Sequence, residues 1–354
     1  MMKTYLFVAI VTALVCMAAT TTPRAGGGMT TAPDSTIFIV PAHFPQPVYR
    51  FADNPLTEAG FTLGRQLFYD PLLSKDGSIS CGNCHQSFAA FANLDHSVSH
   101  GMDFCLGTRN APALFNLAWQ KEFMWDGGVK HIEVSPLNAI TSSCEMASSL
   151  DTITERLKRS PAYVKLFGQA FGNGDINSQK VLRALAQFMS MLVSANSKYD
   201  KHVRNEPGGE FSANEEQGYL LFKQHCSHCH TEPLFTDLSF RNNGLDLVSE
   251  DPGRDTITNN PADRGKFRVP SLRNIMLTPP YMHDGRLGTP EEALEHYNSG
   301  MKQNGNLDVF FMKQTPPGIR LTQQEQKLLI SFLHTLTDME FVNNTKFHEP
   351  APLK

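Results

Sequence analysis

The sequence predicts a mainly α-helical protein built of two domains. Its 354 residues are about twice the length of an ordinary domain. Several segments join a capping signal to apolar residues at helical spacing, whereas strand signals are few. The best strand candidate, 35–40, is equally consistent with an extended arm. Loops rich in Gly, Pro and Asn occupy about 70–115 and 231–288, and loops of that length usually surround a functional site.

The composition is that of an ordinary globular protein, with 41% hydrophobic and 19% charged residues. It excludes a long disordered, collagen-like or coiled-coil chain. The net charge of −4 and the lack of a basic stripe exclude a nucleic-acid binder. Seven cysteines are too few for a disulfide scaffold, so their spacing is more informative than their number.

The N-terminus carries an export signal. Lys3 gives a positive charge, and the apolar stretch Leu6–Met17 is too short to span a membrane but typical of a signal peptide. We expect a signal peptide over 1–20 and a leader or extended arm over 21–45. The alternative is a lipoprotein anchored through Cys16, the one arrangement that implies membrane contact. In both cases the protein acts outside the cytoplasm, in the periplasm or beyond.

Four helices are predicted from their first turns. In one of them Ser178 is the expected N-cap, and the buried apolar face is Val181, Leu182, Leu185, Phe188 and Leu192. Three others begin with capping boxes, formed by Ser212 with Glu215, Thr289 with Glu292, and Thr322 with Glu325. The best linker, Asn205–Gly209, separates the first of these helices from the rest. We therefore expect an N-terminal domain over 46–205 and a C-terminal domain over 206–354.

Each predicted domain carries one copy of Cys-x-x-Cys-His, the attachment motif of a c-type haem. The two thiols bond the porphyrin, and the histidine becomes an iron ligand. Zinc sites and disulfides also use paired cysteines, but neither needs a histidine directly after both pairs. The sequence therefore predicts two covalently bound haems c, held by Cys81, Cys84 and His85 and by Cys226, Cys229 and His230.

Around these motifs the sequence resembles the bacterial di-haem cytochrome c peroxidase family, which includes MauG and its relatives. The resemblance runs from about Asn54 to Thr337 and rests on blocks at 63–70, 109–112, 125–127, 145–146, 267–274 and 280–285. It implies two mainly helical, cytochrome c-like domains with one haem each. The first haem would react with hydrogen peroxide and the second would transfer electrons. Arg273, in the fifth block, is expected to contact a haem.

The same resemblance implies roles around the first haem. Glu145 matches the distal acid–base, a buried carboxylate whose raised pKa suits proton transfer. Ser135 stands where the family often has glutamine, and its shorter side chain changes the distal hydrogen-bond network. Trp125 matches the tryptophan that relays electrons between the haems. His100 matches the histidine that blocks the first iron at rest in the peroxidase branch, with His96 as a competitor.

The resemblance also implies metal ligands elsewhere. Asn110, Thr278 and Pro280 match a calcium site between the domains, built of oxygen ligands. Tyr297 lies 17 residues after Pro280, where the peroxidase branch has an axial methionine and MauG-type members have tyrosine. Met301, one helical turn further on, is the alternative ligand of the second iron.

Two cysteines remain once Cys16 and the haem thiols are set aside. They are Cys105 and Cys144, which flank the segments carrying His100 and Glu145. Since an oxidising compartment favours pairing of such thiols, we predict a disulfide between them.

Three functions are consistent with these residues. A MauG-type oxidase draws electrons from a partner protein, and an axial Tyr297 slightly favours it because a phenolate stabilises ferric iron. A cytochrome c peroxidase takes electrons from a small cytochrome or cupredoxin and reduces hydrogen peroxide to water. A plain di-haem electron carrier is the third possibility, but it has no use for Glu145.

Overall fold

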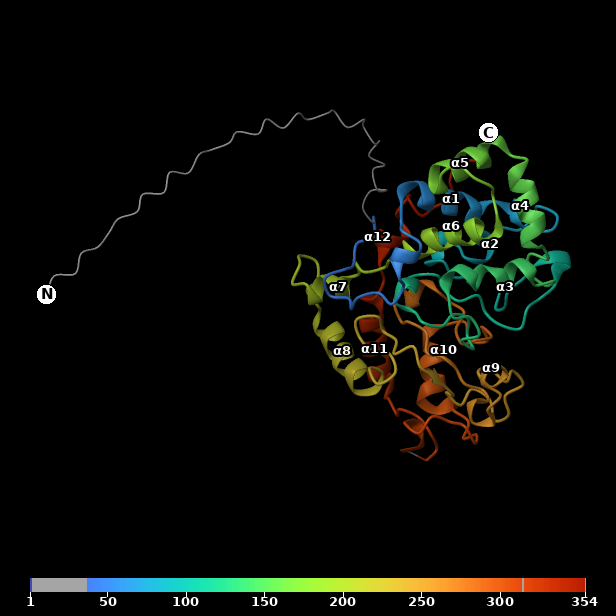
Figure 1. Cartoon of the computed structure of the whole chain (residues 1–354). Coiled ribbons are helices and arrows are strands. Elements are labelled where there is room, and N and C mark those ends of the chain that lie inside the picture. The colour runs from blue at the N-terminus through green and yellow to red at the C-terminus, as the bar shows by residue number, and fades with distance from the viewer. Residues whose placement is uncertain (2–36, 314, 354) are drawn as a thin grey trace. The chain divides into compact units, whose positions relative to one another are not determined.

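The computed structural model describes Met1 and residues 37–313 and 315–353 (Figure 1). The predicted signal peptide, Cys16 and the leader up to residue 36 lie outside the described residues. The helices are α1 Glu58–Tyr69, α2 Cys81–Cys84, α3 Ser135–Thr141, α4 Leu150–Lys158, α5 Pro161–Phe171, α6 Ser178–Ser190, α7 Lys198–Val203, α8 Ala213–His225, α9 Asp255–Thr258, α10 Pro290–Glu295, α11 Gln323–His334 and α12 Met339–Val342.

Strands are few, as predicted. Within the described ranges the one sheet pairs β1 (Phe240–Arg241) with β2 (Phe267–Arg268) in antiparallel register. Both predicted long loops are present and hold only these strands, α2, α9 and short 3₁₀ turns. The mainly helical class is therefore confirmed. None of the described helices is long and apolar enough to cross a bilayer.

The predicted helix starts are formed. Ser212, Thr289 and Thr322 each accept the backbone N–H of the glutamate three residues on, at 3.3, 3.1 and 3.2 Å. The first predicted helix differs by one residue. Asn177 is its cap, with Oδ1 accepting a backbone N–H at 3.0 Å, and Ser178 is the first helical residue. Asparagine caps as well as serine, so the side chain one position earlier takes the role.

The segment at 37–40 is an extended arm rather than a strand. The ring of Phe38 packs against Phe51, with centroids 4.4 Å apart, and against Trp119 at 5.7 Å. Aromatic contacts therefore hold the arm to the N-terminal half without sheet pairing.

One hydrophobic core lies in the N-terminal half, where α1 packs against α6. The helices approach closely because Gly64 has no side chain: a Cβ there would lie 1.9 Å from the carbonyl oxygen of Ala184. The end of the chain returns to this core. Phe341 and Phe347 belong to it, and the Tyr69 hydroxyl donates to the Phe347 carbonyl at 2.7 Å.

The second core lies between α8 and α11, which run side by side in Figure 1. Here too a glycine allows the two helices to approach closely, since a Cβ at Gly218 would lie 2.0 Å from the carbonyl oxygen of Leu328. Residues 35–354 form one compact unit that contains both cores, and the domain boundary at 205/206 stays a prediction.

Candidate functional site

Both motif histidines present the same ring nitrogen. Nδ1 of His85 lies 3.1 Å from the Phe91 carbonyl oxygen, and Nδ1 of His230 lies 3.2 and 3.1 Å from those of Phe235 and Pro270. An N–H at Nδ1 donates to these carbonyls, which leaves the Nε2 lone pair for a metal ion. Burial lowers the pKa of His85 to about 4 and also lowers that of His230, so both rings are neutral near pH 7.

The motif cysteines suit haem attachment. Cys81, Cys84, Cys226 and Cys229 are outside any disulfide, and burial raises the pKa of each thiol. A structural zinc site requires four protein ligands. In the described ranges no group of three or more His, Cys, Asp or Glu side chains is placed to hold a metal ion. Paired thiols beside a neutral imidazole therefore fit covalent haem better than zinc.

The second motif opens onto a cavity of about 250 Å³. Cys229, His230 and Tyr297 line it from the C-terminal half. Trp125 and Asn110 line it from the N-terminal half. The second haem site is thus completed by residues from both parts of the sequence.

The loop that contains Cys105 and the loop that contains Cys144 meet beside the first motif. The predicted disulfide between Cys105 and Cys144 is confirmed and joins them, with the Cα atoms 5.0 Å apart. The backbone N–H of Met102 donates to the Glu145 carbonyl at 3.0 Å. A Cβ at Gly101 would lie 2.0 Å from the Cys144 carbonyl oxygen, so only glycine allows this approach.

Glu145 lies next to the first motif. Burial raises the pKa of its carboxyl, and a hydrogen bond from Ser99 lowers it in part. Burial, and then the charge of Glu145, raise the pKa of the Cys84 thiol. That thiol donates to the His100 carbonyl at 3.8 Å, and the His96 and His100 rings stack with centroids 4.7 Å apart. The structure therefore brings Glu145, both candidate histidines and the first motif together.

Trp125 and Ser135 are both held by main-chain oxygens. The indole N–H of Trp125 donates to the Asn110 carbonyl at 2.8 Å, and the Trp125 carbonyl accepts the backbone N–H of Arg268 at 2.7 Å. Ser135 begins α3, where its hydroxyl donates to the Ile132 carbonyl at 2.8 Å. Its role in a distal network stays a prediction.

The three predicted calcium ligands, Asn110, Thr278 and Pro280, line the same cavity as the second motif. The side-chain amide of Asn110 donates to the Ser97 carbonyl at 2.9 Å, and its backbone N–H donates to the His283 carbonyl at 2.7 Å. Because the Asn110 side chain donates through its NH₂ group, its Oδ1 remains available as an oxygen ligand for a hard cation such as calcium.

Tyr297 lies in the π-helical turn His296–Gly300 that continues α10, and it lines the second cavity. The Asn243 side chain donates to its hydroxyl at 3.3 Å and to the Met282 sulfur at 3.4 Å. Met301 instead lies in the second hydrophobic core, 5% exposed. Sequence reasoning missed Asn243 and Met282, because no local pattern links positions so far from Tyr297.

Three arginines line the second cavity: Arg241, Arg268 and Arg273. Arg273 is fully buried, and its guanidinium pairs with Asp200 at 2.7 Å. Its predicted contact with haem stays a prediction, consistent with its place in the lining. Arg268 was part of a recognised block but had no role assigned to it.

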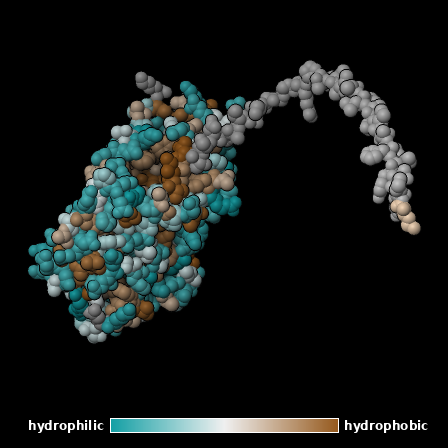
Figure 2. All heavy atoms as spheres, turned by 90° about the vertical axis from the view of Figure 1, so that its left-hand side faces the viewer, coloured by the Kyte–Doolittle hydropathy of each residue, from teal (hydrophilic) through white to brown (hydrophobic). Residues whose placement is uncertain are grey.

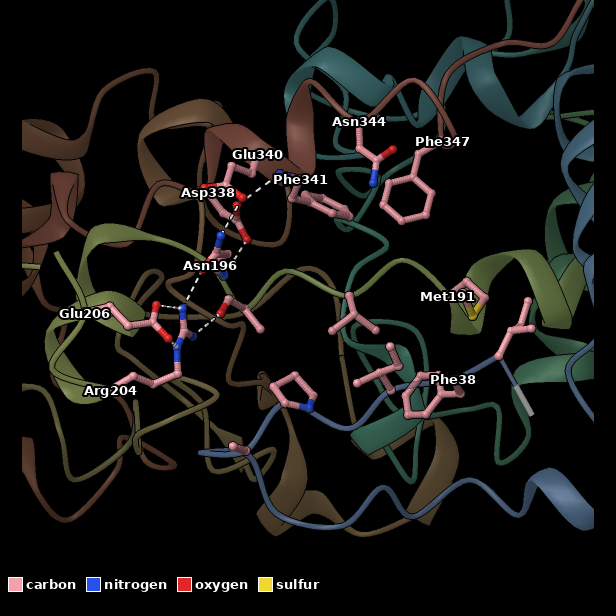
Figure 3. Close-up of a pocket in the computed structure, with 16 residues that line it drawn as sticks. Phe38, Met191, Asn196, Arg204, Glu206, Asp338, Glu340, Phe341, Asn344 and Phe347 are labelled. Atoms are coloured by element: carbon pink, nitrogen blue, oxygen red, sulfur yellow. Dashed lines mark hydrogen bonds and ion pairs between the residues drawn. The ribbon is translucent and has the colours of Figure 1, made fainter. Parts of the chain in front are cut away.

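A more open groove of about 650 Å³ contains no motif residue (Figure 3). Phe38, Met191 and Phe341 give it apolar walls, and apolar hollowed surface is visible in Figure 2. Arg204 at its edge pairs with Glu206 at 2.7 Å. This ion pair lies within the groove lining, and the lining includes no motif cysteine or histidine that could hold a haem.

Two cysteine pairs, each followed by a neutral histidine with an available Nε2, define a di-haem c-type protein. The comparisons agree. Residues 58–208 match the family described as di-haem cytochrome c peroxidase. The methylamine utilization protein MauG of Methylorubrum extorquens is 37% identical over 289 residues, 80% of this chain and 79% of that protein. The cytochrome c551 peroxidase of Nitrosomonas europaea is 36% identical over 239 residues, 66% of this chain and 71% of that protein.

Solved structures give the same result. The crystal structure of a MauG-like protein associated with microbial copper homeostasis is 32% identical, with a TM-score of 0.78, covering 88% of this chain and 98% of that one. The diheme peroxidase BthA from Burkholderia thailandensis shares the fold at 21% identity, with a TM-score of 0.71 over 84% and 91% of the two chains. This chain belongs to the di-haem cytochrome c peroxidase family. It is an oxidoreductase with two covalently bound haems c.

Proposed function

We propose that this chain is an exported, MauG-like enzyme that reacts with hydrogen peroxide and oxidises a partner protein. The observation that carries the proposal is Tyr297, whose phenol lines the cavity of the second motif together with His230. Met301, the alternative ligand, is buried in the hydrophobic core instead. A phenolate favours ferric over ferrous iron, so such a site is a poor acceptor from an ordinary cytochrome and suits oxidation of a protein substrate.

Glu145 is the proton-transfer group of this proposal. A haem held by Cys81, Cys84 and His85 would supply the iron for the reaction with hydrogen peroxide. Since burial raises the pKa of Glu145, its carboxylate is a stronger base than an exposed one and so a better proton acceptor. It accepts the proton of one peroxide oxygen and returns it to the leaving oxygen. The disulfide beside it at Cys144 limits the movement of its loop.

Trp125 is the proposed electron relay between the two sites. It lines the second cavity and belongs to the first half of the chain. Its indole N–H donates to the main-chain carbonyl of Asn110 at 2.8 Å. An amide oxygen is too weak a base to take that proton, so Trp125 would pass electrons while keeping it.

The second candidate is a cytochrome c peroxidase, which reduces hydrogen peroxide to water with electrons from a small cytochrome or cupredoxin. It is favoured by His100, whose carbonyl oxygen lies 3.8 Å from the Cys84 sulfur of the first motif and which matches the distal ligand of the peroxidase branch. The haem-loaded enzyme with peroxide and reduced cytochrome c separates the two. The MauG-like proposal expects slow turnover and a long-lived oxidised state; rapid turnover supports the peroxidase.

Ferric spectra test the ligand directly. We expect no sulfur-to-iron charge-transfer band in the wild type, and a changed coordination state in Tyr297→Phe. Met282→Leu and Met301→Leu are the matched controls, since Met282 lines the second cavity and Met301 is the alternative ligand that the sequence offers. A sulfur band that survives Tyr297→Phe and vanishes in either methionine variant would show that the ligand is that methionine.

We also propose that calcium bridges the two halves through Asn110, Thr278 and Pro280. All three residues line one cavity, although Asn110 lies in the first half of the sequence and Thr278 and Pro280 lie in the second. Chelation should therefore change both the haem spectra and the turnover, with recovery on adding Ca²⁺ but not Mg²⁺, which demands a tighter octahedral site. Unchanged spectra after verified calcium removal would contradict the assignment.

A further inference from the structure

Of the three arginines that line the second cavity, Arg268 alone has no carboxylate partner in the described part of the chain. Arg241 pairs with two carboxylates at 2.7 and 2.8 Å, and Arg273 pairs with Asp200 at 2.7 Å. The side chain of Arg268 makes one hydrogen bond, from Nε to the Met124 carbonyl at 3.3 Å. Its two terminal NH₂ groups donate to no acceptor within the described ranges.

The position of Arg268 makes this lack of a partner costly. The residue is only 8% exposed. Burial lowers the pKa of its guanidinium to about 10, an effect that Glu122 opposes, so the group is still charged near pH 7. A largely buried charge without a counter-charge is strongly unfavourable. The Arg268 guanidinium is therefore suited to pair with an anion that enters this cavity.

We propose that Arg268 binds a propionate carboxylate of the second haem. The same cavity is lined by Cys226, Cys229 and His230, so the cofactor attached there brings carboxylates into it. Two parallel N–H groups of a guanidinium match the two oxygens of a carboxylate. The other two arginines of the cavity are already neutralised by the protein.

The same residue holds the relay tryptophan. The backbone N–H of Arg268 donates to the Trp125 carbonyl at 2.7 Å, and its Nε donates to the neighbouring Met124 carbonyl. Arg268 thus joins the Trp125 loop to the second haem through one side chain. It is a positioning residue, since it acts on the potential of that haem and on the placement of Trp125.

The test is a redox titration of haem-loaded variants, followed by EPR to separate the two irons. In Arg268→Gln the propionate loses its counter-charge, which favours ferric iron. We expect the ferrous-to-ferric ratio of the second haem at a fixed potential to fall about tenfold, equal to about 59 mV for one electron. Arg268→Lys keeps the charge and should stay within about threefold of wild type. Arg254→Gln is the control, because Arg254 donates to the Asp126 carbonyl at 2.9 Å without lining the cavity, and it should not shift the second haem.

Two results would overturn the proposal: an unchanged second-haem potential in Arg268→Gln, or an equal shift in the lysine variant. If the glutamine variant does not accumulate with both haems, resonance Raman spectra of Arg268→Lys decide. The propionate band moves if the guanidinium is its partner, and an unmoved band refutes the pairing. The proposal depends on the second haem and not on its axial ligand, so methionine ligation in place of Tyr297 would leave it standing.

Discussion

Removing the Cys105–Cys144 disulfide should lower the free energy of unfolding by about 4 kcal/mol. The crosslink closes a loop whose ends are 39 residues apart in sequence. In the chain-entropy treatment, a loop of that length removes about 13 cal/mol/K from the unfolded state, which is about 4 kcal/mol at 25 °C. The perturbation is the double variant Cys105→Ser, Cys144→Ser.

The assay is equilibrium urea unfolding of the haem-loaded protein, with linear extrapolation to water. Wild type in a thiol reductant is the matched control. The four other cysteines outside the signal region are the motif thiols, which haem thioethers protect from reduction. The reduced wild type should therefore match the double variant. A loss below about 1 kcal/mol in both would refute the loop-entropy reasoning.

The same change should also slow the reaction with peroxide. Cys144 directly precedes Glu145, and without the crosslink the loop is held at this point by the Met102 N–H bond to the Glu145 carbonyl. A base displaced by a fraction of an ångström transfers protons less efficiently. Stopped-flow mixing with peroxide measures this rate, and an unchanged rate would show that the loop holds its geometry without the disulfide.

Two further predictions concern carboxylates. Burial raises the pKa of Glu145, so its proton-accepting form is lost as pH falls through a value above the ordinary 4.5. The rate of the peroxide reaction should therefore fall on the acid side, and this acid limb should be absent in Glu145→Gln. The same limb in the glutamine variant would assign it to another group. Burial alone would raise the pKa of Asp200, but Arg273 and then His43 lower it well below its usual range. Its stabilisation is therefore present above about pH 4 and lost as pH falls. Asp200→Asn should destabilise the protein by about 3 kcal/mol at pH 7, whereas the control Glu340→Gln, at a partly exposed pair with Lys201, should cost under about 1 kcal/mol. Equal losses in the two variants would contradict the burial argument.

The features that could be predicted from the sequence are local. A capping box such as Ser212 with Glu215 depends on residues three apart, and Cys-x-x-Cys-His depends on five consecutive residues. The disulfide could also be predicted, because only two thiols remained to pair. The cap at Asn177 was missed by one residue, since two adjacent side chains can both cap.

The features that could not be predicted are contacts between distant segments. Asn243 approaches Tyr297 across 54 positions, and nothing in either neighbourhood indicates the pairing. The return of Phe347 to the first core is of the same kind, because an apolar residue near a chain end is compatible with many partners. The missing counter-charge at Arg268 is visible only once three arginines are seen in one cavity.

Because each core depends on its own glycine contact, one half of the protein can be perturbed while the other half serves as the control. Gly64 lies in the helix before the first motif and Gly218 in the helix before the second, each against a backbone carbonyl that cannot yield as a side-chain tip can. A single methyl group at either position forces its helix pair apart, at a cost of roughly 1–3 kcal/mol. Gly64→Ala and Gly218→Ala therefore loosen one half at a time within the same molecule. Any signal that changes in both halves after a one-sided substitution measures how strongly the two sites communicate.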